Sequence, residues 1–197
     1  KYMPPKIMRN SGAPRSILIV SDSGNFDSVV KRSLKGFITI DTRKSGALAR
    51  RCILERDYDI VVIKSPLPDE TGEALAIDVA EKSDASVMIV IAREFFEEIA
   101  EKVTDYGIFV VSELSFRDQI NKDMRFLVAM QNRVIRLKYM VSKAEEKAED
   151  TRIVSKAKLL LIEKRHMTED DAHRFIGKMA MNNGISRRKA AERILED

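Results

Sequence analysis

The chain has 197 residues, of which 44% are hydrophobic and 34% are charged. This apolar share suffices for a packed core, so disorder of the whole chain is excluded. The single cysteine, Cys52, excludes an internal disulfide framework and a cysteine-rich zinc site, which needs about four Cys or His ligands. No apolar run reaches the roughly 18–20 residues of a membrane span, and we expect a cytoplasmic protein without membrane contact.

The net charge of +4 is distributed unevenly along the chain. Up to Asp118 there are 17 basic and 19 acidic residues, which leaves 18 of the chain's 35 basic and 12 of its 31 acidic residues for the remainder. The first part therefore has a net charge of −2 and the second part of +6. This division indicates two functions, with the basic part as the candidate for an anionic partner, although a solvated helical surface would explain the charge equally well.

Residues 1–14 include three prolines but no apolar core like that of a signal peptide, and we expect an N-terminal tail there. Five short runs rich in Val and Ile follow, at Ser16–Ser21, Phe37–Ile40, Ile60–Ile63, Val87–Ile91 and Ile108–Val111. The segments between these runs have the apolar periodicity of helices, at Phe26–Leu34, Ser45–Arg56, Glu73–Ala80 and Glu94–Thr104. Buried strands that alternate with helices predict an α/β domain over residues 15–117, with a doubly wound parallel sheet of five strands.

No strand pattern appears after Phe116, and residues 119–150 contain neither Pro nor Gly. Apolar residues recur there in alternating steps of three and four, which is a heptad pattern. The positions are Leu127, Met130, Val134, Leu137, Val141 and Ala144. We predict a long helix over residues 118–152 that forms a parallel homodimeric coiled coil through this seam. Packing of the seam on its own domain is the alternative.

Residues 153–197 are predicted to form three helical segments. The first, Ile153–Arg165, could continue the long helix. The second begins at Thr168, whose hydroxyl is placed to cap the helix together with Asp171, and ends before Gly184. The third begins after a cap at Ser186. The pattern is that of a small helical module on the end of a long helix.

Several stretches of the first domain match one known family. Ile17–Asp22 lies where that family ends its first strand with paired acids, and Asp59–Lys64 fits its third strand. The loop Leu67–Gly72 matches its Pro…Gly loop, and Tyr106–Val111 fits its fifth strand. The domain thus resembles the receiver domain of response regulators, which implies a flavodoxin-like fold.

The same resemblance implies a degenerate phosphorylation site. A receiver needs an aspartate that attacks the phosphoryl donor, carboxylates for Mg²⁺, and a Ser/Thr and a Lys for the phosphoryl oxygens. The phosphoacceptor position falls on Lys64, and only Asp22 of the paired acids remains because the other falls on Ser21. The Ser/Thr position falls on Ile91 and the Lys position on Glu113. We expect a pseudo-receiver that takes no phosphate, in which Lys64 pairs with Asp22 or Glu113.

The segment from Ile153 to Leu195 resembles the ANTAR domain, the RNA-binding module of transcription antitermination regulators. The resemblance rests on Ala157–Ile162, Met167–Ile176, Lys178–Met181, Ile185–Arg188 and Ala191–Leu195. It implies a dimer that binds tandem hairpins in a nascent leader transcript and prevents a terminator stem from forming. Lysines and arginines of the module are the candidate RNA ligands, because they neutralise phosphates. They are Lys156, Lys158, Arg165, Arg174, Lys178, Arg187, Arg188, Lys189 and Arg193.

Neither half contains a catalytic motif, and the two histidines lack matched metal ligands, so we expect neither an enzyme nor a metal or cofactor site. Without phosphorylation, control would come from a regulatory protein or a small ligand at the receiver-like domain, or from constitutive dimerisation. Two alternatives remain. The chain could be a scaffold module that docks a signalling partner, or a DNA-binding regulator, since residues 181–194 have a helix–turn–helix pattern.

Overall fold

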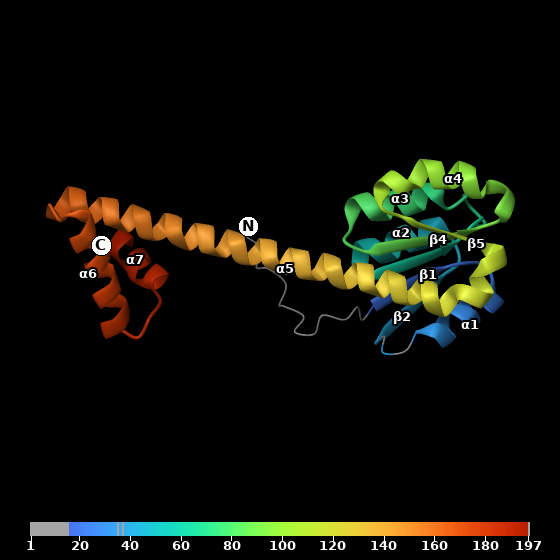
Figure 1. Cartoon of the computed structure of the whole chain (residues 1–197), viewed down its shortest axis with the longest axis horizontal. Helices are drawn as coiled ribbons and strands as arrows, with labels where there is room; N and C mark the ends of the chain where they lie inside the picture. The colour runs from blue at the N-terminus through green and yellow to red at the C-terminus, as the bar shows by residue number, and fades with distance from the viewer. Residues whose placement is uncertain (1–15, 35, 37, 197) are drawn as a thin grey trace. The chain divides into compact units, whose positions relative to one another are not determined.

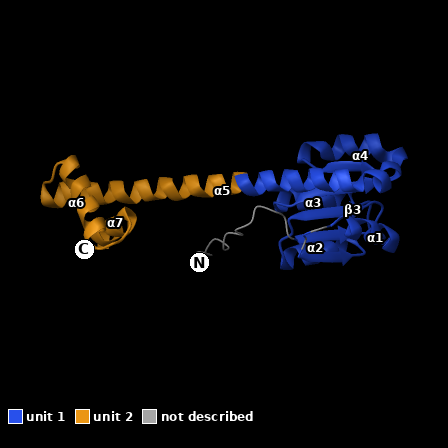
Figure 2. Ribbon diagram, turned by 60° about the horizontal axis from the view of Figure 1, so that its bottom comes forward, with its two compact units in different colours: residues 1–136 blue, residues 137–197 orange. Residues whose placement is uncertain are grey.

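The computed structural model describes residues 16–34, 36 and 38–196, so the tail expected at residues 1–14 lies outside the described residues. The chain divides into two compact units, with the division between Arg136 and Leu137 (Figure 2). Within the described residues, no helix combines the length and the apolar character needed to cross a membrane.

The first unit contains one parallel sheet of five strands in the order β2-β1-β3-β4-β5 (Figure 1). The strands are β1 (Ser16–Val20), β2 (Thr39–Arg43), β3 (Ile60–Lys64), β4 (Ser86–Ile91) and β5 (Phe109–Ser112). This order is the flavodoxin-like one, in which the strand sequence reverses beside β1. The predicted doubly wound parallel sheet is confirmed.

Helices cover both faces of this sheet, which is why the central strands are continuously apolar. Helices α2 (Gly46–Glu55), α3 (Glu73–Lys82) and α4 (Phe96–Val103) pack on one face (Figure 1). Helix α1 (Gly24–Ser33) and the beginning of α5 (Glu113–Arg165) pack on the other face. Short 3₁₀ turns flank α4, namely η1 (Arg93–Phe95) and η2 (Thr104–Tyr106).

Strand β2 differs from its predicted position, because it lies two residues further along the chain than Phe37–Ile40. Phe37 itself lies outside the described residues. Ile38 is 72% exposed and precedes the strand, whose sequence TIDTR is largely polar. Among the described strands β2 lies at the edge of the sheet beside β1, so it does not need the continuous apolar run by which the buried strands are recognised.

Helix α5 is 53 residues long and begins at Glu113, five residues before the predicted start of the coiled-coil segment. Its first turns belong to the α/β unit, because Phe116, Ile120, Met124 and Leu127 are buried against the sheet and α1. Phe116 stacks on Phe26 of α1 with ring centroids 4.8 Å apart. The predicted boundary between residues 117 and 118 therefore falls inside the packed part of the helix rather than at its end.

Gln131 connects α5 to the amino end of β4. Its side chain is 3% exposed, and its Oε1 accepts hydrogen bonds from the backbone N and the Oγ of Ser86, at 3.1 and 2.7 Å. Its Nε2 donates to the carbonyl oxygen of Asp84 at 3.0 Å. Both partners precede or begin β4, so a single amide satisfies polar groups at the amino end of that strand.

The second unit consists of the end of α5, α6 (Glu169–Asn182) and α7 (Arg187–Glu196) around a core of small and aliphatic residues. The predicted caps are confirmed: the Thr168 hydroxyl accepts from the Asp171 backbone N, and the Ser186 hydroxyl accepts from the Lys189 backbone N. Gly184 adopts the left-handed conformation, with a φ of 60°, where the chain leaves α6. Ile153–Arg165 does continue the long helix.

Candidate functional site

Lys64 and Glu113 lie together at the carboxyl edge of the sheet. Lys64 ends β3, Glu113 begins α5 directly after β5, and the Lys64 Nζ lies 3.4 Å from the Glu113 Oε1. The pairing with Glu113 is therefore present, and the described residues show no ion pair between Lys64 and Asp22. An ammonium group therefore lies at the position for which the resemblance predicts a nucleophilic carboxylate.

The other residues of the predicted degenerate site have separate environments. Ser21 is buried, and its Oγ accepts a hydrogen bond from the Ser23 backbone N at 2.9 Å, so it belongs to the turn that caps α1. Asp22 is exposed. Ile91 is 1% exposed in the core and is aligned with Ser112 of β5, the residue before Glu113. An isoleucine side chain there donates no hydrogen bond to a phosphoryl group.

Sequence reasoning missed one carboxylate at this edge, Asp27. Burial raises the pKa of the Asp27 carboxyl, while a hydrogen bond from Ser21 and the charge of Lys31 act in the opposite direction. Its Oδ1 is buried and has no hydrogen-bond partner among the described residues. The same part of the chain contains no group of three or more His, Cys, Asp or Glu side chains arranged to hold a metal ion.

Three of the nine candidate RNA ligands are held in ion pairs within the second unit. The Lys158 Nζ lies 2.7 Å from the Glu169 Oε1, which joins α5 to the first turn of α6. Arg174 pairs with Asp171 in the same turn. Arg188 pairs with Asp150 of α5 at 3.0 Å and with Glu192 of α7 at 2.8 Å. The pairs of Lys158 with Glu169 and of Arg188 with Asp150 join two helices, the other two each lie within one helix, and all of them neutralise positive charge within the unit.

The remaining candidates have no carboxylate partner in the described part of the chain. Arg165 lies with its guanidinium carbon 5.3 Å from the centroid of the Phe175 ring. The other five are exposed on the three helices of the unit, and they are Lys156, Lys178, Arg187, Lys189 and Arg193. An exposed cation without an internal counter-ion is available to neutralise the phosphates of a nucleic acid.

The structure divides the predicted dimer seam into two parts. Leu127 is 2% exposed and packs in the core of its own unit, so it is not available to a second chain, and its assignment to the seam is corrected. Met130, Leu137, Val141 and Ala144 are exposed, and Val134 is half-buried. Other apolar side chains of α5 are exposed beside them and were not part of the predicted seam, namely Phe126, Tyr139 and Met140.

Comparison with known proteins identifies the domains. Residues 142–195 match the model of the ANTAR domain, which therefore begins before the predicted residue 153. The transcriptional regulatory protein PdtaR of Mycobacterium tuberculosis is 25% identical over 196 residues, which cover 98% of this chain and 95% of PdtaR.

Solved receiver domains resemble the first unit. The signal receiver domain of an HD domain-containing protein from Pseudomonas fluorescens Pf-5 has a TM-score of 0.53 at 15% identity, covering 64% of this chain and 94% of that one. The chemotaxis response regulator CheY4 of Vibrio cholerae has a TM-score of 0.50 at 17% identity, covering 58% and 98%. The chain therefore carries a receiver-fold domain followed by a C-terminal ANTAR domain.

Proposed function

We propose that this chain is a cytoplasmic, non-enzymatic regulator of transcription that binds tandem hairpins in nascent leader RNA as a dimer and prevents terminator formation. The observation that carries the proposal is the ANTAR match over residues 142–195, on a helical unit in which six exposed candidate cations have no carboxylate partner among the described residues. Lys and Arg give RNA affinity through phosphate neutralisation, and hairpin loops are read by shape, stacking and edge contacts. The relative PdtaR is a transcriptional regulatory protein, which supports the same direction.

The binding test compares RNA containing two adjacent stem-loops with random RNA and with duplex DNA. We expect nanomolar, salt-sensitive affinity for the two-hairpin RNA alone. Replacing Arg187 and Lys189 with Ala removes two exposed charges. The slope of log affinity against log salt should then fall by about 2, which is about 1 for each phosphate that is no longer neutralised.

The matched control removes two basic side chains from the receiver-fold unit, as Arg51→Ala with Lys82→Ala. Both residues lie on the outer surfaces of α2 and α3 in i,i+4 ion pairs, and their loss should leave the salt slope unchanged. Equal affinity for duplex DNA would favour the DNA-binding alternative, and no nucleic-acid binding would favour a scaffold function. If two-hairpin RNA binds, read-through of a terminator in a purified transcription reaction should rise with protein concentration.

We also propose that the receiver-fold unit does not take phosphate. The ion pair between Lys64 and Glu113 and the burial of Ile91 support this, because an ammonium group and an apolar side chain stand at positions where the resemblance predicts the nucleophile and a phosphoryl ligand. With acetyl phosphate and Mg²⁺, intact-mass spectrometry should show no added phosphoryl group on the wild type or on Lys64→Asp, since the variant still lacks ligands at Ile91 and Glu113. Stoichiometric phosphorylation of the wild type would refute the proposal.

Regulation then acts through a protein partner or a small ligand at the receiver-fold unit, or dimerisation is constitutive.

A further inference from the structure

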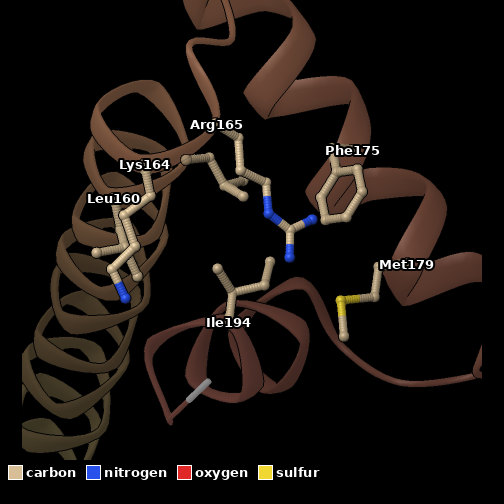
Figure 3. Close-up of a pocket in the computed structure, with 7 residues that line it drawn as sticks. Leu160, Lys164, Arg165, Phe175, Met179 and Ile194 are labelled. Atoms are coloured by element: carbon tan, nitrogen blue, oxygen red, sulfur yellow. The ribbon is translucent and has the colours of Figure 1, made fainter.

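The second unit, residues 137–197, contains the ANTAR match and is the ANTAR unit. It has a pocket between the end of α5, α6 and α7 (Figure 3). Its volume is about 130 Å³, and it is lined by Leu160, Leu161, Lys164, Arg165, Phe175, Met179 and Ile194. Figure 3 shows the Arg165 guanidinium between the Phe175 ring and Ile194, with Met179 below that ring in this view. An engineered apolar cavity of about 150 Å³ accepts benzene, so a pocket of this size suits a single aromatic ring.

The chemistry of the lining combines an apolar floor with cations. Leu161 and Ile194 are buried, and Phe175 and Met179 are half-buried. Lys164 and Arg165 supply two positive charges, and the lining contains no carboxylate. A ligand that fits must therefore bring a planar, largely apolar group together with a negative charge, and a nucleotide has both.

Arg165 makes a different contact from Arg174 and Arg188 of the same unit. Arg174 and Arg188 pair with carboxylates, whereas the Arg165 guanidinium carbon lies over the Phe175 ring, 5.3 Å from its centroid. Arginine planes and aromatic rings are the surfaces on which proteins stack the unpaired bases of RNA loops. Arg165 is also the last residue of α5, and the next residue, His166, has a left-handed backbone, with a φ of 50°.

We propose that this pocket binds one unpaired base of an RNA hairpin loop, an inference that rests on the proposed function. The base enters over the floor formed by Leu161 and Ile194 and stacks against the Arg165 guanidinium, and Lys164 neutralises the phosphate beside it. The pocket thereby contributes recognition of the loop, in addition to the sequence-independent attraction of the exposed cations.

The experiment combines a substitution in the protein, made in the whole 197-residue chain, with a change in the RNA probe. The probe is the tightest two-hairpin RNA selected from a pool with randomised loops, prepared intact and with each loop position made abasic in turn. Arg165→Lys keeps the charge and removes the plane. We expect it to weaken binding of intact RNA about tenfold, or ~1.4 kcal/mol. At one loop position, removal of the base should weaken binding to the wild type about tenfold. The affinity of Arg165→Lys for that abasic RNA should be the same as the affinity of the wild type for it.

Arg187→Lys is the matched control, because the same exchange at an exposed arginine outside the pocket should have equal effects on intact and abasic RNA. If the effect of Arg165→Lys persists on every abasic RNA, the pocket is not a base site, although RNA binding stands. If wild type binds the selected RNA no better than random RNA, the proposed function fails and the pocket assignment with it.

A second measurement reports on the pocket directly and does not depend on a variant that folds. Met179 lines the pocket, whereas Met181 on the same helix is 76% exposed and does not line it. In the wild type with isotope-labelled methionine methyl groups, intact RNA should shift the Met179 signal by ring currents more than the Met181 signal. The abasic RNA that loses affinity should abolish this shift, and an unshifted Met179 signal in the complex would overturn the proposal.

Discussion

At the scale of single residues, Lys64 shows how one side chain changes the chemistry of a site without adding much stability. Its partner Glu113 is 51% exposed, and an ion pair with so accessible a partner contributes only ~0–1 kcal/mol. The consequence is chemical: the ammonium group cannot act as a nucleophile towards a phosphoryl donor, and it brings a positive charge to an edge where receivers gather carboxylates.

Asp123 is a residue for which the structure predicts a pH-dependent stability. It lies on the part of α5 that packs on the sheet, is 8% exposed, and has an Oδ2 without a hydrogen-bond partner among the described residues. Burial raises the pKa of this carboxyl, and the charge of Lys122 offsets this only in part. Burial of the charged form without a partner opposes folding at neutral pH.

We therefore expect Asp123→Asn to increase the free energy of unfolding by ~1 kcal/mol at pH 7. Because the folded-state pKa lies above the ordinary value of 3.8, the wild type regains this stability as the pH falls through the folded-state pKa. The difference between the two proteins should vanish below pH 3.8, where both states of the wild type are protonated. Urea unfolding at several pH values measures this, and a constant difference across the range would contradict it.

At the scale of elements, α5 shows which features of this fold are accessible from sequence. The absence of Pro and Gly after Phe116 and the alternating apolar steps correctly indicate one long helix. The pattern does not tell which surface covers each apolar residue: Leu127 and Leu137 belong to the same seam, yet the first is buried in its own unit and the second is half exposed. Gln131 was missed because a lone polar residue in a helix gives no periodic signal, and its role comes from contacts 45 residues away in sequence.

Two glycines of the ANTAR unit give a paired prediction for helix stability. A Cβ added at Gly177 or at Gly184 meets no atom within 4 Å, so neither substitution is limited by space. Gly177 lies inside α6, where alanine should stabilise the unit by ~0.8–1 kcal/mol through helix propensity. Gly184 has a φ of 60°, where a Cβ costs ~1–2 kcal/mol, so Gly184→Ala should destabilise it.

Hydrogen exchange of the α6 amides in the full chain measures both changes. The expected result is opposite in sign for the two glycines, and the same sign for both would contradict the backbone argument. Arg187→Ala, an exposed change without an ion-pair partner in the described residues, should leave the exchange rates unaltered and serves as the reference.

At the scale of the whole molecule, the net charge of +4 is the sum of a slightly acidic first part and a basic second part. The order of the domains, the parallel sheet and the caps of the last helices could all be predicted, because each depends on local patterns or on a continuous buried strand. The predicted position of β2 was wrong because an edge strand has few apolar residues by which it can be recognised. The two units divide at residue 136 and not at 117, because α5 contributes residues to both units. Which cations remain without a carboxylate partner depends on side-chain contacts, and charge counts along the chain do not contain this information.

The exposed apolar residues of the predicted α5 seam support the proposed dimer, and substitutions among them test it. Leu137 and Val141 are 51% and 56% exposed, so Leu137→Asp with Val141→Asp leaves the cores of both units intact and should change the stability of the monomer by less than ~0.5 kcal/mol. If a second chain covers these residues, burying two carboxylates prevents assembly, and sedimentation velocity should show a monomer in place of the wild-type dimer.

The contrasting variant is Leu127→Ala, seven residues before Val134 on the same seam. Because Leu127 is buried in the core of its own unit, this change should cost ~2–5 kcal/mol of unfolding free energy while the protein still assembles. The two variants thus separate a helix that packs on its own domain from one that packs on a partner, although both carry the same heptad pattern. A wild type that sediments as a monomer at micromolar concentrations would refute the dimer, and the exposed apolar face of α5 would then require a different partner.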